Sequence, residues 1–155
     1  MYQRIHDHLY RQLQAMRLLC SLIEEEYDIL LARDVNAVAP LEFSIQELIR
    51  QIAAEKMSVI NLLQKGKVSD YAALLPPEQA GPLRRIYTDI DRHEQEASRG
   101  ASRNAKLALA LLDQNQNILQ TLQSKAMPRQ AVTYNRRGAM RYREKPEPSI
   151  IVGKF

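Results

Sequence analysis

Apolar residues recur at helical spacing in three long stretches of this chain, and this spacing limits what the chain can fold into. The steps between apolar positions are three, four or seven residues, which places the side chains along one face of a helix. The first stretch covers residues 2–32, and its stripe consists of Ile5, Leu9, Met16, Cys20, Ile23, Tyr27 and Leu30. The chain has only two Phe, five Gly and no Trp, a composition that suits long helices packed through a narrow aliphatic stripe. The sequence therefore predicts an all-α protein.

A second helix is expected after a corner at residues 33–36, where Asp34 or Asn36 can cap it. Its stripe consists of Val38, Leu41, Ile45, Leu48, Ile52, Val59 and Leu63. Glu55 and Lys56 occupy the one step at which an apolar residue is due, and Gly66 is expected to end the helix. Two such helices joined by a short corner should fold as an antiparallel hairpin.

The third helix is expected to be the longest. A short helical turn over residues 70–75 stops at Pro76-Pro77, and Gly81-Pro82 then begin a helix that extends to residue 124. Its stripe consists of Leu83, Ile86, Ile90, Ala97, Asn104, Leu107, Leu111, Ile118 and Leu122. The middle of this stripe is thin, and small residues such as Gly100 allow helices to approach closely. The predicted fold is an antiparallel coiled-coil bundle of three helices with a short helical turn before the third.

The end of the chain differs in composition from the rest. Residues 124–155 contain eight Lys or Arg and two Glu, a net charge of +6. Because the whole chain carries +4, the preceding residues carry −2. Three prolines and the loss of helical periodicity predict a flexible segment. We therefore divide the chain into a helical coiled-coil body, residues 1–124, and a basic flexible tail, residues 125–155.

The predicted helices are unequal in length. At 1.5 Å per residue the first two span roughly 45 Å each and the third about 60 Å. The hairpin should therefore leave the end of the third helix uncovered, and a bare apolar stripe usually marks a partner site. The candidate binding residues are Leu107, Leu111, Ile118, Leu119, Leu122 and Tyr134. Alternatively, the tail or a second copy of the chain folds back over this stripe.

Residues that could support catalysis or bind a metal form no recognisable pattern. His6 and His8 are two residues apart and would point in different directions on a helix. His93 stands alone on the third stripe, and the single cysteine, Cys20, lies among apolar residues and reads as a small core residue. The sequence has no zinc spacing, nucleophile–base pattern or glycine-rich phosphate loop. We expect no enzyme activity, no cofactor and no metal, and instead a protein that binds another protein.

Two further features concern location and other partners. No apolar stretch could span a bilayer and the start lacks the apolar run of a signal peptide, so we expect a cytoplasmic protein without membrane insertion. Arginines of the tail alternate with Tyr134 and Tyr142. The arginines could contact the phosphates of a nucleic acid, and the tyrosines could stack on its bases. The slightly acidic body and the lack of a recognisable nucleic-acid-binding fold argue against that role.

Several segments resemble the FlgN family. Leu-Ile-Glu-Glu-Glu at residues 22–26 and Leu-Leu-Ala-Arg-Asp at 30–34, followed by Leu41, Leu48 and Ile52, resemble its first hairpin. Asn-Ala-Lys-Leu at residues 104–107 is similar to its third helix, and Thr-Tyr-Asn-Arg-Arg-Gly at 133–138 to its tail. The resemblance covers most of the chain, with its pieces in the same order.

This resemblance implies a flagellar export chaperone. Such a protein holds hook-associated junction subunits of the FlgK and FlgL type in the cytoplasm and delivers them to the flagellar type III export apparatus. The client's amphipathic terminal helix would cover the bare stripe by helix-in-groove recognition. A competing interpretation is a structural or regulatory coiled coil that self-associates through the same stripe, for example as a homodimer.

Overall fold

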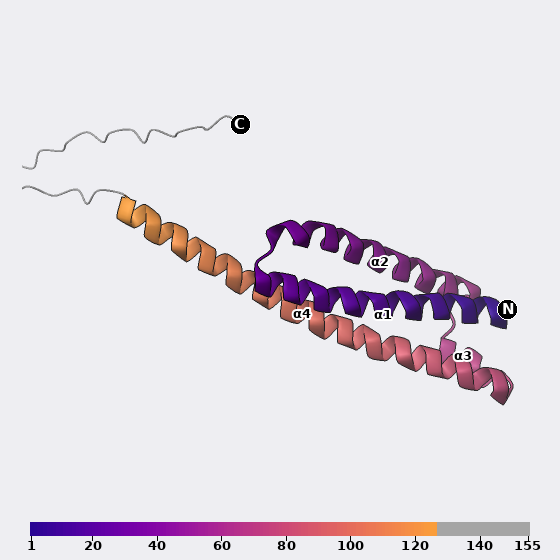
Figure 1. Ribbon diagram of the computed structural model, residues 1–155. Coiled ribbons are helices and arrows are strands. Elements are labelled where there is room, and N and C mark those ends of the chain that lie inside the picture. The colour runs from indigo at the N-terminus through magenta and orange to yellow at the C-terminus, as the bar shows by residue number, and fades with distance from the viewer. Residues whose placement is uncertain (127–155) are drawn as a thin grey trace, which may run out of the picture. The chain divides into compact units, whose positions relative to one another are not determined.

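The computed structural model describes residues 1–126, which form four helices (Figure 1). They are α1 (Tyr2–Ala32), α2 (Val35–Leu62), α3 (Val68–Ala73) and α4 (Pro77–Ala126). The all-α prediction is confirmed for these residues, among which no strand occurs. The chain divides into two compact units, Met1–Asn117 and Ile118–Phe155. The predicted tail from residue 127 onward, including Tyr134, lies outside the described residues, and the boundary at residue 124 stays a prediction.

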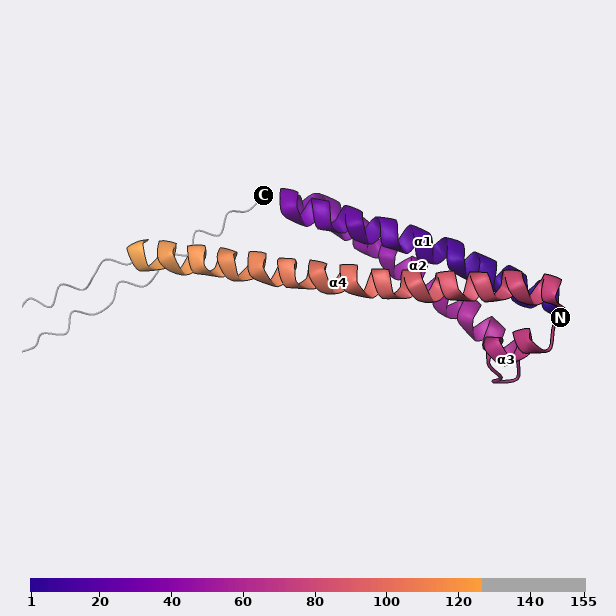
Figure 2. The ribbon, with the colours of Figure 1, turned by 90° about the horizontal axis from the view of Figure 1, so that it is seen from below.

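Helices α1 and α2 form the expected hairpin and pack along their lengths (Figures 1 and 2). The chain turns at Arg33, whose φ of 57° is left-handed and whose backbone N–H donates to the carbonyls at the end of α1. Asp34 then caps α2, because its carboxylate accepts from the backbone N–H groups of Asn36 at 3.2 Å and Ala37 at 3.3 Å. Of the two cap residues that the sequence offered, the structure uses Asp34.

Helix α4 runs parallel to α1 within the unit Met1–Asn117. The thiol of Cys20 donates to the carbonyl of His93 at 3.4 Å, and Asn104 donates to the carbonyl of Ile23 at 2.7 Å. Residue numbers thus increase along both helices in the same direction. Helix α2 itself brings the chain back to the N-terminal end of α1, and the segment that contains α3 connects it there to the start of α4 (Figure 2).

The core consists of two clusters, and α1 supplies the largest share of both. The first cluster contains Ile5, Leu9, Leu13, Val59, Val68, Ala72, Leu83 and Ile90. The second contains Met16, Leu19, Ile23, Leu41, Ile45 and Ala97. The single stripe expected on α1 was too narrow, because Gln12, Leu13, Ala15 and Leu19 are buried as well. Helix α1 contacts both α2 and α4, so that it buries more than one face.

Two predicted helix ends differ from the structure. Helix α4 begins at Pro77 instead of Pro82, and the carbonyl of Pro76 accepts from the N–H groups of Gln79 and Ala80, both at 2.9 Å. A proline is well suited to the first helical position because its missing N–H has no partner there in any case. The prolines that were expected only to stop the preceding turn therefore also start α4.

Gly66 does not end α2 by adopting a left-handed conformation, as a terminal glycine commonly does. Gln64 and Lys65 occupy that region instead, with φ values of 51° and 68°. A Cβ added at Gly66 would lie 2.9 Å from the carbonyl oxygen of Leu63. Glycine is therefore needed here for the close approach of the backbone. No helix of residues 1–126 is long and apolar enough to cross a membrane.

Candidate protein-binding site on helix α4

The inward face of α4 is buried up to Asn104 and becomes exposed beyond it. Leu83, Ile90, Ala97 and Asn104 are buried, and Asn104 is only 2% exposed. At helical spacing the same face continues through Leu107 and Leu111, which are half-buried. Further along, Ile118 and Leu122 are exposed by 50% and 58%, and Leu119 beside them is exposed too. Apolar groups that belong to one stripe thus lose their cover within a single helix.

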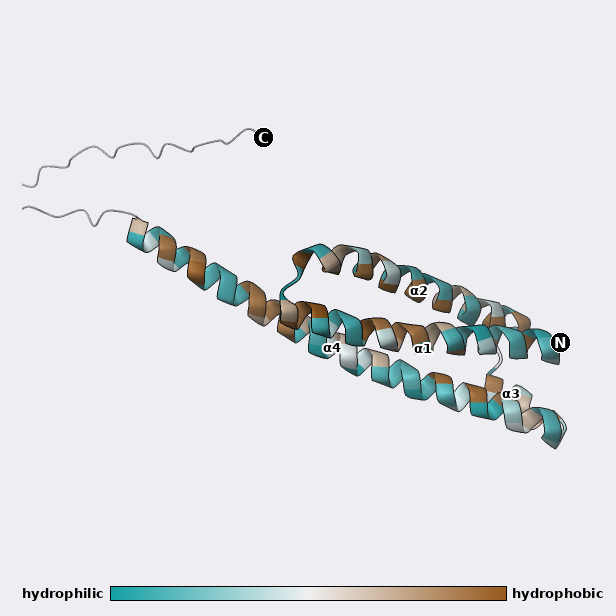
Figure 3. Cartoon of the chain, viewed as in Figure 1, coloured by the Kyte–Doolittle hydropathy of each residue, from teal (hydrophilic) through white to brown (hydrophobic). Residues whose placement is uncertain are grey.

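This part of α4 is also nearly free of charge. Between residues 107 and 124 the only charged side chain is Asp113, and the polar positions are filled by Asn, Gln, Thr and Ser. Figure 3 shows hydrophobic residues recurring along this part of α4 between hydrophilic ones. Depletion of charged residues distinguishes the centres of protein interfaces from the remaining surface. A solvated helix would carry more Lys and Glu.

Two further exposed leucines escaped the sequence analysis. Leu109 and Leu112 are both more than half exposed. Leu112 lies seven residues before Leu119, so these two side chains share one edge of the stripe. Leu112 could therefore have been predicted from this spacing of seven residues. Leu109 faces away from the stripe, and no pattern in the sequence marks it.

The corner of the hairpin lies beside Gln114 of α4. The guanidinium of Arg33 donates to the side-chain oxygen of Gln114 at 2.7 Å. Leu31 and Val35, on either side of the corner, are exposed. Exposed apolar groups of the corner and of α4 therefore occur at the same end of the unit Met1–Asn117.

A buried polar network joins α4 to α1 where the cover ends. The amide of Asn104 donates to the Ile23 carbonyl at 2.7 Å and to the carboxylate of Glu26 at 2.8 Å. Next to it, Arg103 lies 3.1 Å from the Glu24 carboxylate and stacks over the ring of Tyr27 at 3.9 Å. A buried amide that is satisfied in only one alignment fixes the register of two helices.

Glu26 also contacts α2. It forms a hydrogen bond with the carboxyl group of Glu42, and this bond, with burial, raises the pKa of Glu42 above its ordinary value. Two carboxylates cannot share a hydrogen bond unless one of them holds a proton. The three helices thus meet at a polar cluster whose protonation affects its stability.

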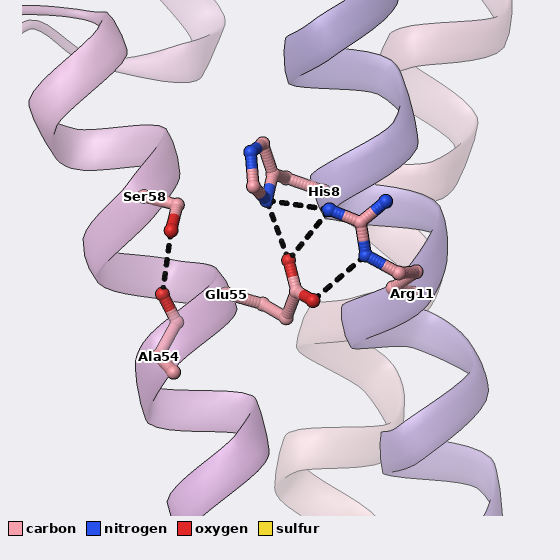
Figure 4. A network of polar contacts seen from close by, with 5 residues as sticks. All are labelled: His8, Arg11, Ala54, Glu55 and Ser58. Atoms are coloured by element: carbon pink, nitrogen blue, oxygen red, sulfur yellow. Dashed lines mark hydrogen bonds and ion pairs between the residues drawn. The ribbon is translucent and has the colours of Figure 1, made fainter.

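Glu55, which with Lys56 interrupts the apolar stripe of α2, is the centre of a second polar network (Figure 4). The Glu55 carboxylate accepts from Arg11 Nε at 2.7 Å and lies 2.5 Å from His8 Nδ1. The hydrogen bond from Arg11, helped by His8, lowers the pKa of Glu55 although burial opposes this shift. Lys56, the next residue, lies 3.8 Å from the carboxylate of Glu94 on α4. This interruption of the stripe links α2 by ion pairs to both neighbours.

Potential metal ligands come together in one place among the described residues. The sulfur of Cys20, a ring nitrogen of His93 and a carboxylate oxygen of Glu96 all lie within 4.8 Å of one another. Cys20 and His93 lie 73 positions apart in the sequence, where each was interpreted alone. The spacing of His93 and Glu96 on one helical face was visible in the sequence, but the alignment of α1 with α4 that adds Cys20 was not.

The predicted binding residues that the structure describes are divided between the two units. Leu107 and Leu111 lie in the first unit and Ile118, Leu119 and Leu122 in the second, all on α4. Tyr134 is outside the described residues. That these residues bind a client stays a prediction.

Comparison with known proteins finds a matching family model. None of the curated proteins and none of the solved structures matches the chain. The family model described as FlgN protein matches residues 1–141 of the 155. That match agrees with the resemblance of the hairpin, of the third helix and of residues 133–138. The chain therefore belongs to the FlgN family, a family of flagellar export chaperones.

Proposed function

We propose that this chain is a cytoplasmic export chaperone for hook-associated junction subunits of the FlgK and FlgL type. It binds the amphipathic terminal helix of such a subunit through Leu107, Leu111, Ile118, Leu119 and Leu122 on α4. The bound subunit cannot assemble prematurely and is delivered to the flagellar type III export apparatus. Tyr134 and the tail assist in binding the client.

One observation carries this proposal. The inward face of α4 passes from fully buried at Asn104 to exposed at Ile118 and Leu122. A partner helix that presents leucines at steps of three and four could continue the packing that α1 provides earlier along α4. Because residues 107–124 carry almost no charge, the free energy of desolvating such an interface is small.

The exposed corner supports the same binding mode. Leu31 and Val35 stand next to the part of α4 that Arg33 contacts through Gln114. A client helix laid along residues 107–117 would meet these two side chains as well. We therefore include the corner in the proposed client surface.

A self-associating coiled coil is the second candidate, and the same exposed face favours it. A second copy of the chain could cover Ile118 and Leu122 as a client helix would. A chaperone would form a complex with its client, whereas a self-associating coiled coil would form a complex of two copies of this chain. Light scattering after size exclusion over a range of concentrations measures the mass of the free chain, and a stable dimer held by this face would favour self-association.

The test compares double substitutions in the full chain. Ile118→Ala with Leu122→Ala removes the centre of the proposed surface, and each truncation should cost about 1–3 kcal/mol of binding free energy. The affinity for a purified junction protein should fall by at least roughly tenfold. The melting temperature should change little, because both side chains are exposed in the free protein.

Two control variants make the result specific. Gln116→Ala with Gln120→Ala alters exposed positions on the opposite side of the same helix and should leave binding intact. Leu48→Ala with Ile52→Ala removes side chains packed on the second core cluster and should lower the melting temperature. If the Ile118 and Leu122 pair instead lowers the melting temperature as much and leaves binding intact, the stripe is ordinary core and the proposal fails.

A further inference from the structure

Three side chains with different metal-binding atoms converge between α1 and α4. Cys20 comes from α1, while His93 and Glu96 are three residues apart on α4 and therefore share one helical face. His93 Nδ1 lies 2.8 Å from a Glu96 oxygen, and the Cys20 sulfur lies 3.4 Å from the backbone carbonyl of His93. The potential ligand atoms all fall within 4.8 Å of one another.

This geometry is close to what a zinc-type ion needs. Zn²⁺ binds sulfur at about 2.3 Å and nitrogen or oxygen at about 2.0–2.2 Å in a tetrahedron, so its ligand atoms stand roughly 3.5 Å apart. A side-chain movement of about 1 Å would close the remaining gap between the ligand atoms. The side chain of Glu96 is 44% exposed and can make this movement.

The surroundings give the ion access to the three side chains. A cleft of about 380 Å³ opens beside Cys20 and Glu96, with Gly100 and Arg103 also in its wall. It offers a path for the ion and room for a water molecule as fourth ligand. A thiolate and a carboxylate together neutralise a divalent cation. Two arginines, Arg99 and Arg103, also line this cleft, and Arg103 is paired with Glu24 at 3.1 Å.

We propose that Cys20, His93 and Glu96 form a binding site for a divalent transition metal of the zinc type that links α1 to α4. Binding replaces the proton of the Cys20 thiol, which passes to the solvent, by a metal–sulfur bond. The ion would join α4, the helix with the proposed client surface, to α1. It adds a cross-link at the point where Gly100 brings the two helices together.

Co²⁺ added to the reduced full-length chain provides the direct test, because thiolate-bound Co²⁺ has a near-ultraviolet charge-transfer band and tetrahedral Co²⁺ has intense visible bands. We expect both bands to appear, saturate at one ion per chain and vanish on addition of Zn²⁺. Zn²⁺ should also raise the melting temperature by mass action. Neither readout depends on chaperone function, so failure here would leave the proposed function untouched.

Substitutions then assign the ligands. Cys20→Ser should abolish the charge-transfer band, and His93→Gln and Glu96→Gln should each weaken Co²⁺ binding by at least about tenfold. His8→Gln is the matched control, since His8 belongs to the separate pair with Glu55 and its loss should not affect Co²⁺ binding. Circular dichroism verifies that each variant is folded.

Two results would overturn the proposal. No band on the wild-type chain would mean that the three side chains merely pack together. A band that Cys20→Ser removes but that keeps its affinity in His93→Gln and Glu96→Gln would mean adventitious binding to a thiol. Unfolding of Cys20→Ser does not rescue the proposal, because His93→Gln and Glu96→Gln decide it independently.

Discussion

Asn104 occupies a position in the stripe of α4 where a leucine would give more apolar burial. Its amide has two acceptors on α1, the carbonyl of Ile23 and the carboxylate of Glu26. Sliding α4 by one turn would separate the amide from both and leave a buried polar group without partners, which costs about 1–3 kcal/mol. Asn104 thus exchanges apolar burial for a defined register at the last covered position of α4.

Gly100, one turn earlier, sets how closely the two helices approach. A Cβ at this position would lie 2.6 Å from Ile23 Cγ2. Alanine is the better helix former by about 1 kcal/mol, but forcing a methyl group into a packed contact costs about 1–3 kcal/mol. We expect Gly100→Ala to lower the free energy of unfolding in urea by about 1 kcal/mol.

Gly81→Ala is the control for this substitution. A Cβ at Gly81, in the same helix, would meet no atom within 4 Å, so only the propensity gain remains and the variant should be more stable. If both variants are stabilised to the same extent, Gly100 does not mark a close contact between α1 and α4.

Glu42 is expected to make stability depend on pH. Its pKa is raised by the hydrogen bond with Glu26, with burial as the next cause. A raised pKa in the folded state means that the stabilising contribution is complete below the ordinary value of 4.5 and is lost as the pH rises through the raised pKa. Above the raised pKa of Glu42, both Glu42 and Glu26 are ionised, and the two carboxylates repel each other.

Glu42→Gln supplies a permanent amide donor to Glu26 and should stabilise the protein at neutral pH by about 0.5–1.5 kcal/mol. Melting temperatures measured from pH 4 upward should decline less in this variant than in the wild type. A parallel decline in both proteins would show that Glu42 does not share a proton with Glu26. Glu42→Ala, which removes the repulsion without adding a donor, should fall between the two.

At the scale of the elements, the charged step of α2 determines how the hairpin is joined. Glu55 stands where the stripe calls for an apolar side chain, and its own side chain is only 14% exposed. The bonds from Arg11 and His8 lower its pKa. This contribution to stability is therefore present above the ordinary value of 4.5 and is lost as the pH falls through the lowered pKa.

Glu55→Gln should cost roughly 1 kcal/mol at neutral pH, a value reduced by the partial exposure of Arg11. The loss should shrink in acid, since the wild-type carboxylate is itself protonated there. Thermal melts at neutral and acidic pH test both parts. Glu47→Gln, which removes an exposed pair with Arg50 inside α2, should leave the melting temperature nearly unchanged. Equal effects of the two substitutions would mean that the Glu55 network is an ordinary surface pair.

Helical periodicity predicted the elements well because each stripe reports local geometry. The bounds of α1 follow directly from it, whereas capping preference limited the cap of α2 only to Asp34 or Asn36. Periodicity within one helix cannot report a second neighbour, so the burial of Leu13 and Leu19 on α1 was missed. For the same reason the cluster of Cys20 with His93 and Glu96 was not predicted, because it depends on how α1 and α4 are aligned.

Across the whole molecule, burial is distributed unevenly over the helices. Eight residues of α1 are buried but only three of α2. All buried residues of α4 lie between Ala80 and Asn104. Regions with few buried apolar contacts open most easily, so the protein should be most stable around α1 and least stable along the last part of α4. A binding surface that a client must reach belongs in such a region.

Hydrogen exchange tests this distribution in the free chain and in its complex. In the free chain, backbone amides of residues 105–117 should exchange faster than those of residues 83–104, because the buried residues of α4 end at Asn104. A junction protein bound to the proposed surface should slow exchange in residues 105–117 and leave the slow amides in the middle of α1 unchanged. Equal protection of both parts of α4 in the free chain would mean that something already covers the stripe. A dilution series then identifies the cover. Protection by a second copy decreases as the protein is diluted, whereas protection by the chain's own tail does not.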